Sequence, residues 1–114
     1  MDKQQRRQQI ADYKRRTVRR GIYRVHCTAS GESWAGPAND LSTIGNRLWF
    51  TLRLGNHPHR QLQQAWNLHG AAAFEWHDAL QLEDEPDLHD FERERLLQDA
   101  LAEVCRRTGA TPLR

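Results

Sequence analysis

The sequence has no long apolar run and little cysteine. No stretch approaches the roughly 18 consecutive apolar residues of a membrane-spanning helix, and the opening residues, MDKQQRRQQIADYKRR, lack the apolar segment of a signal peptide. Cys27 and Cys105, the two cysteines, are too few to staple a small fold through disulfides. The sequence therefore predicts a cytoplasmic protein with reduced thiols and no membrane partner.

Several signatures of catalytic and metal sites are also missing. The chain has no Gly-rich phosphate loop, no G-x-S-x-G turn and no Cys/His nucleophile pattern. His57 and His59 form an H-x-H pair, but no C-x-x-C or H-x(3)-H spacing completes a set of four zinc ligands. A structural zinc site is therefore not expected.

Charge is divided unevenly along the 114 residues, a length that suits one domain. Residues 1–60 hold 12 Lys and Arg against 4 Asp and Glu, whereas residues 61–114 hold 5 against 11. Of the 17 basic residues, 15 are arginine, whose planar guanidinium group can donate two hydrogen bonds to phosphate oxygens. The densest basic cluster gives the candidate nucleic-acid contacts Arg15, Arg16, Arg19, Arg20 and Arg24. A solvated basic helix end is the alternative, and the acidic half limits any nucleic-acid contact to one side of the molecule.

Seven elements can be predicted from hydrophobic periodicity and from the Gly, Pro and capping residues that end helices and strands. Helices are expected over 2–18, 41–54, from Pro58 to Gly70, and over 88–107; strands are expected over 22–28, 33–36 and 73–80. The order α-β-β-α-α-β-α predicts an α+β fold, with a small three-stranded antiparallel sheet flanked by helices. The expected units are a basic N-terminal helix or arm (1–20), a folded domain (21–108) and a short tail (109–114).

One carboxylate in the last helix falls where an apolar side chain is expected. The predicted buried stripe contains Phe91, Leu97, Leu101 and Val104, and Glu94 lies three residues from both Phe91 and Leu97. A carboxylate directed at the sheet is costly unless it is paired or holds a metal. The residues alone leave open a pairing between Glu94 and an arginine of the first half.

The motifs, in their order along the chain, resemble the GIY-YIG nucleases. Gly21-Ile22-Tyr23 matches the first half of the paired motif, and Trp34-Ala35-Gly36 is a degraded form of the second half. Asp40-Leu41 follows at the expected distance, and the stretch that runs from Gly55-Asn56-His57 through His69-Gly70 to Phe74-Glu75 also resembles the family. Glu92-Arg93-Glu94 resembles its acidic motif, so the resemblance covers about residues 21–105.

The resemblance implies a metal-dependent endonuclease that hydrolyses DNA phosphodiester bonds. Glu94 would then be the one protein carboxylate on Mg²⁺ or Mn²⁺, which suits a metal that keeps its waters. Tyr23 would act as general base or orient the attacking water, and His57 would assist proton movement near the scissile phosphate. Trp34 replaces the family's second tyrosine. Its indole can line the site and stack on a ligand, but it has no hydroxyl group.

Departures from the family pattern support a second hypothesis. Ile44 occupies the position where the family has an arginine, and Arg47 lies about 60° further round the helix. Residues 106–114 contain no asparagine, which the family often has there. The alternative function is therefore a catalytically degenerate domain that binds nucleic acid or a protein partner without cutting. The sequence leaves open a homodimer and the type of DNA that is bound.

Overall fold

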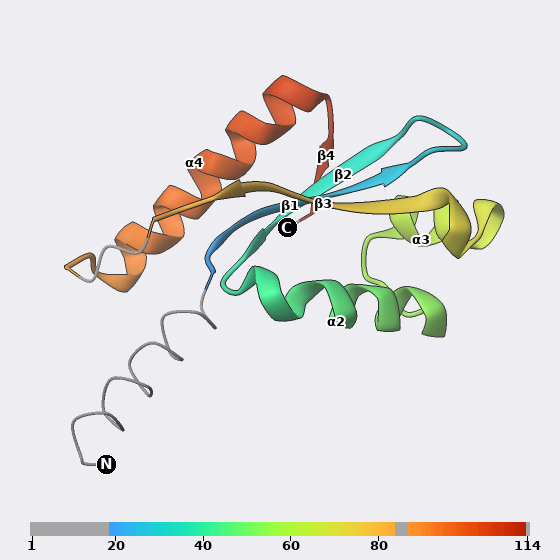
Figure 1. Ribbon diagram of the computed structural model, residues 1–114, viewed down its shortest axis with the longest axis horizontal. Helices are drawn as coiled ribbons and strands as arrows, with labels where there is room; N and C mark the ends of the chain where they lie inside the picture. The colour runs from blue at the N-terminus through green and yellow to red at the C-terminus, as the bar shows by residue number, and fades with distance from the viewer. Residues whose placement is uncertain (1–18, 84–86, 114) are drawn as a thin grey trace, which may run out of the picture.

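The computed structural model describes residues 19–83 and 87–113 (Figure 1). The predicted N-terminal helix, Arg15 and Arg16 lie outside the described residues. The elements are β1 (Gly21–Cys27), β2 (Ser33–Ala38), α2 (Leu41–Leu54), α3 (Arg60–His69), a 3-10 turn (Ala71–Ala73), β3 (Phe74–Gln81), α4 (Asp90–Thr108) and β4 (Thr111–Pro112). The predicted α+β class is confirmed, and so is the predicted order β-β-α-α-β-α from β1 to α4.

The sheet has one strand more than the sequence predicts. Its order is β3-β1-β2-β4, and β1 is antiparallel to both β2 and β3. β4 pairs in parallel with the outer edge of β2 at Trp34 and Ala35. Because Ala110 and Leu113 are both buried, the segment expected as a short tail belongs to the folded domain.

Local signals fix both ends of α2. Asp40 is the N-cap, and its carboxylate accepts a hydrogen bond of 2.9 Å from the Ser42 backbone N–H. Gly55 ends the helix in the left-handed region at φ 78°, where a side chain would be strained. The predicted boundaries of 41–54 are therefore confirmed.

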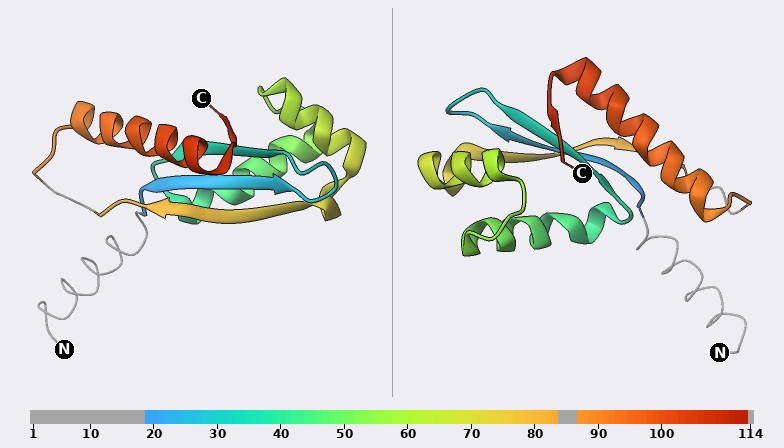
Figure 2. Two further views of the ribbon diagram at one scale, coloured as in Figure 1. Left: turned by 90° about the horizontal axis from the view of Figure 1, so that it is seen from above. Right: turned by 180° about the vertical axis from the view of Figure 1, so that it is seen from behind.

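Helices cover both faces of the sheet, which gives the molecule two helical layers, one on each face, and two cores. α2 and α3 lie on one face and α4 crosses the other (Figures 1 and 2). The α2–α3 core takes Tyr23, Val25 and Cys27 from β1, and the α4 core takes Ile22 from the opposite face of the same strand. No helix in the described ranges 19–83 and 87–113 is long and apolar enough to cross a membrane.

A register shift moves Leu80 to the layer opposite the one that strict alternation predicts. Tyr23 pairs with Asp78 but Ile22 pairs with Leu80, so β3 carries one extra residue between these pairs. As a result, Phe74 and Trp76 pack in the α2–α3 core, whereas Leu80 packs in the α4 core.

The buried stripe of α4 also differs from the prediction. It contains Leu97, Ala100, Leu101 and Val104, whereas Phe91 is 72% exposed and Glu94 is exposed. From Leu97 the stripe continues four residues back, to the partly buried Arg93, rather than three residues back to Glu94. The expectation that Phe91 and Glu94 point at the sheet was wrong, because a 3.6-residue period permits either step.

Candidate active site

Tyr23 projects from β1 into the α2–α3 layer and lies directly over Gly36 of β2. The two residues are partners in the antiparallel register. A Cβ atom on Gly36 would overlap the Tyr23 hydroxyl oxygen and would approach the ring carbon Cζ to 2.6 Å. Position 36 must therefore be glycine for the phenol to lie flat against the neighbouring strand.

The glycine that precedes the tyrosine has a similar steric reason. A Cβ atom on Gly21 would overlap the carbonyl oxygen of Leu80 and lie 3.0 Å from Leu41 Cδ1. At this point β1 meets the bulged end of β3 and the start of α2, where the Leu41 N–H donates to the Arg19 carbonyl at 2.7 Å. The two motif glycines thus let three elements meet at the end of the sheet that carries Tyr23.

The Tyr23 ring is held on its other side by Trp76. Their ring centroids are 4.7 Å apart and the rings are within 10° of parallel. Tyr23 is only 6% exposed, and burial raises its pKa to about 12. Near neutral pH the side chain is therefore an uncharged phenol, which can donate or accept a hydrogen bond but is a weak base.

Trp34 and Ile44 contribute to the core rather than to an open surface. Trp34 is 1% exposed and lies 6.3 Å from Phe74 between ring centroids, so a ligand cannot stack on it without rearrangement. Ile44 is half-buried against the α2–α3 core. Arg47 is exposed, and on a helix of about 100° per residue it projects from the side of α2, away from the buried Leu48.

His57 lies in the short link between α2 and α3. The His59 backbone N–H donates to His57 Nδ1 at 3.0 Å, so the proton of the neutral ring lies on Nε2. Desolvation, followed by the nearby His59, lowers the pKa of His57. The ring thus favours the neutral form, which offers an N–H donor. Tyr23 stacks on Trp76, which lies beside Gly45 in the N-terminal half of α2, whereas His57 follows the C-terminal end of this helix of about 20 Å. His57 and Tyr23 therefore lie toward opposite ends of α2.

Glu94 belongs to the other layer but to the same end of the sheet as Tyr23. The preceding residue, Arg93, lines a small cavity together with Arg20, the residue before β1. The exposed Glu94 carboxylate accepts a hydrogen bond of 3.1 Å from Gln98 Nε2. The structure therefore places Glu94 and Tyr23 near the start of β1, on opposite faces of the sheet.

Comparison with solved structures gives two matches. The catalytic domain of the homing endonuclease I-TevI is 26% identical, with a TM-score of 0.57, over 83% of this chain and 98% of that one. A single-substitution variant of the catalytic domain of intron endonuclease I-TevI is 24% identical, with a TM-score of 0.54, over 76% and 89%. The chain has a GIY-YIG-like fold. No family model matches the sequence, and no curated protein is similar enough to count as a relative.

Within this GIY-YIG-like fold the predicted basic cluster divides between the layers. Arg19 forms an ion pair with Asp78 at 3.3 Å, and its Nε donates to the Ser42 hydroxyl at 3.2 Å, so it ties β3 to α2. Arg20 and Arg24 are half-buried. Arg20 lines a cavity together with Arg93 of α4, and Arg24 alternates with Tyr23 along β1, which places it on the α4 face. The described arginines of the cluster therefore do not form one continuous phosphate-binding patch.

Acidic side chains suited to a metal are sparse in the GIY-YIG-like domain. Residues 19–83 and 87–113 contain no group of three or more His, Cys, Asp or Glu side chains that could hold a metal ion. A single exposed carboxylate such as Glu94 still fits Mg²⁺, which keeps several waters and is commonly bound by one or two carboxylates together with substrate phosphates. It does not fit zinc, which needs three or four protein ligands.

Three tryptophans from three different elements meet beside the α2–α3 core. Trp49 lies on α2, Trp66 on α3 and Trp76 on β3, so sequence spacing does not show that they are neighbours. In the structure, Trp49 lies 5.9 Å from Trp76 and 5.6 Å from Trp66 between ring centroids. The signal was the unusual number of tryptophans, four in 114 residues, but only the fold shows that three of them meet.

Proposed function

We propose that this protein is a metal-dependent endonuclease that hydrolyses DNA phosphodiester bonds. The observation that carries the proposal is the Tyr23 phenol, held between Gly36 and Trp76 in a fold similar to an endonuclease catalytic domain. A buried phenol fixed by a glycine on one side and an indole on the other is well placed to orient a reactant.

Tyr23 would position the attacking water through its hydroxyl. With a pKa near 12 the phenol is protonated at neutral pH, so orientation rather than proton removal is its proposed task in the resting protein. His57 would donate its Nε2–H to a phosphate oxygen of the bound strand, because Nδ1 is already occupied by the His59 N–H. Arg47, which projects from the side of α2, would supply positive charge to the phosphate during hydrolysis.

Glu94 would hold the Mg²⁺ or Mn²⁺ ion. When bound, the metal would neutralise charge on the scissile phosphate, which would have to lie at the end of the sheet that Glu94 and Tyr23 share, within reach of both faces. The Gln98 amide donates to one oxygen of the Glu94 carboxylate, and within residues 19–83 and 87–113 the other oxygen has no hydrogen-bond partner. A carboxylate restrained in this way loses less side-chain freedom when it binds a cation.

The test is nicking of supercoiled plasmid DNA with Mg²⁺ or Mn²⁺. We expect cleavage by the unaltered protein, and its loss in Tyr23→Phe and in Glu94→Gln. Because Glu94 is exposed, Glu94→Gln should leave the melting temperature unchanged. Asp99→Asn, a matched change at another exposed carboxylate of α4, should cut normally. Activity that survives in both Tyr23→Phe and Glu94→Gln would overturn the assignment of this site.

One observation favours the alternative, a degenerate domain that binds nucleic acid without cutting. Ile44 stands at the position where the GIY-YIG nucleases have an arginine, and the structure packs this side chain against the core. Arg47 would have to replace that arginine from an exposed position on the helix. Specific DNA binding with no cleavage under any divalent metal would decide for the alternative.

A further inference from the structure

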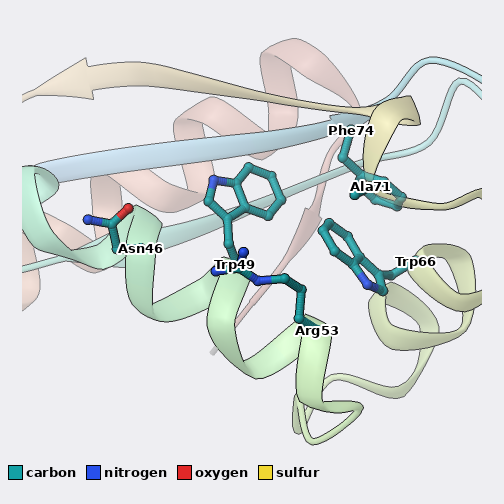
Figure 3. Close-up of a pocket in the computed structure, with 6 residues that line it drawn as sticks. All are labelled: Asn46, Trp49, Arg53, Trp66, Ala71 and Phe74. Atoms are coloured by element: carbon teal, nitrogen blue, oxygen red, sulfur yellow. The ribbon is translucent and has the colours of Figure 1, made fainter.

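A cavity of about 420 Å³ lies between α2, α3 and the start of β3, on the same layer as Tyr23. Its lining residues are Asn46, Trp49, Arg53, Trp66, Ala71 and Phe74 (Figure 3). The volume falls in the range of roughly 300–1,000 Å³ typical of small-molecule sites. Trp49 and Trp66 are each half-buried, so part of each indole is available to a ligand.

Aromatic rings connect this cavity to Tyr23. Trp76 stacks on Tyr23 and meets Trp49 edge to face, with centroids 5.9 Å apart. Trp49 in turn stacks on Trp66, which lies 5.3 Å from Phe74. A ligand bound against Trp49 and Trp66 would therefore sit on the same side of the sheet as Tyr23, further along α2.

The polar groups of the cavity are suited to a nucleotide. Arg53 and Asn46 are exposed, and neither side chain has a hydrogen-bond or ion-pair partner among the residues that the structure describes. In Figure 3 the Arg53 side chain runs back along α2 toward Trp49. Guanidinium and amide groups beside an aromatic wall can contact a phosphate and the edge of a base, respectively.

The charge around the cavity favours the same ligand. No Asp or Glu lies between residues 41 and 74, a segment that supplies all of α2 and α3 and carries Arg47, Arg53 and Arg60. The lining contains no carboxylate that would repel a phosphate. An aromatic wall with positive and no negative charge is typical of sites that bind unpaired nucleotides.

We propose that this α2–α3 cavity binds an unpaired nucleobase of the nucleic acid on which the domain acts. The base stacks on the exposed parts of Trp49 and Trp66, Arg53 contacts the adjoining phosphate, and Asn46 reads the base edge. The inference rests on the proposed function for the class of ligand, and it specifies a preferred substrate: DNA with an extrahelical or single-stranded base.

The test compares two labelled duplexes by fluorescence anisotropy, in EDTA so that no strand is cut. One duplex is fully paired, and the other is identical except for one extrahelical base. We expect about tenfold tighter binding of the second duplex, together with quenching of tryptophan fluorescence, because one base gains an aromatic stacking partner. Equal affinity for the two duplexes would overturn the inference.

Variants can assign this preference to the cavity. Ala71→Met fills the space from an exposed position and should abolish the preference while leaving affinity for the paired duplex unchanged. Ala72→Met, at the next residue, is exposed and outside the lining, and it should keep the preference. A preference that persists in Ala71→Met would contradict the assignment.

The outcome is separable from that of the proposed nuclease function. A preference for the extrahelical base without plasmid nicking would retain the cavity assignment and reject the nuclease. Nicking without any preference would reject the cavity assignment alone.

Discussion

The two helical layers of this domain bury similar apolar stripes against one sheet but differ in the charge they present. α2 and α3 contain three arginines and no acidic residue, whereas α4 contains five acidic and four basic residues. Aromatic rings line the first layer, and the second is filled by aliphatic side chains. Under the proposed function, the α2–α3 layer would meet the nucleic acid, while α4 would contribute Glu94 from the other side of the sheet.

Removal of Arg47 should have the largest effect. If its guanidinium supplies charge to the phosphate, Arg47→Ala should slow plasmid cleavage by about 10²–10³-fold, the size seen when one charge-stabilising donor is lost. Affinity for DNA in EDTA should change much less. Arg60→Ala, which removes an exposed arginine from the same layer, is the control and should cut normally. An Arg47→Ala variant with full activity would favour another source of charge.

Substitution of Gly36 tests how closely Tyr23 fits against the sheet. Gly36→Ala places a Cβ atom within the phenol, which Trp76 prevents from moving aside, so we expect a loss of about 1–3 kcal/mol in the free energy of unfolding. Gly45→Ala is a contrasting control in the same layer. Its Cβ would lie 3.6 Å from Trp76, an ordinary contact, and alanine should stabilise the helix by about 0.5–1 kcal/mol. Urea titrations of both variants would measure these opposite signs.

Alkaline pH should destabilise the protein through Tyr23. The folded protein keeps the phenolic proton up to about pH 12, whereas the unfolded chain releases it near pH 10, so stability falls as pH rises between these values. At pH 11 the loss relative to pH 9 should be about 1.4 kcal/mol. Urea titrations of the unaltered protein and Tyr23→Phe would isolate this contribution. A difference between the two proteins that is independent of pH would show that the phenol ionises normally.

Salt dependence should reveal a smaller difference between the layers. If Arg53 neutralises one phosphate, Arg53→Ala should reduce the slope of log affinity against log salt by about 0.9. Arg107→Ala, in α4, should leave the slope unchanged, because Arg107 is already paired with Glu103 at 2.9 Å. Equal reductions in the two variants would mean that nucleic acid contacts both layers.

Sequence reasoning succeeded where the signal was local. Asp40 and Gly55 defined α2 correctly, because a cap and a left-handed terminus act over a few residues. The aromatic–small–glycine pattern at 34–36 likewise pointed to the strand that accommodates Tyr23. The α+β class and the GIY-YIG-like fold could be predicted from the order of such signals.

Predictions failed where the outcome depended on the register between distant segments. The extra residue in β3 turns Leu80 to the other face, and no residue type marks it in the sequence. The buried stripe of α4 passes through Arg93 instead of Glu94. The helical period permits a step of either three or four residues back from Leu97, and packing against the sheet determines which one is buried. The α2–α3 cavity could not be predicted either, because Trp49 and Trp66, which line it, belong to different helices.

The outer edge of β2 is covered over part of its length by β4, which affects how the protein behaves at high concentration. β4 occupies this edge at Trp34 and Ala35, and the Leu113 N–H donates to the Ala35 carbonyl at 2.6 Å. Where β4 ends, Pro37 supplies a residue that cannot donate to a further strand. On this side of the sheet the exposed edge is therefore the two-residue β4, which contains Pro112 and is a poor template for edge-to-edge pairing with another chain.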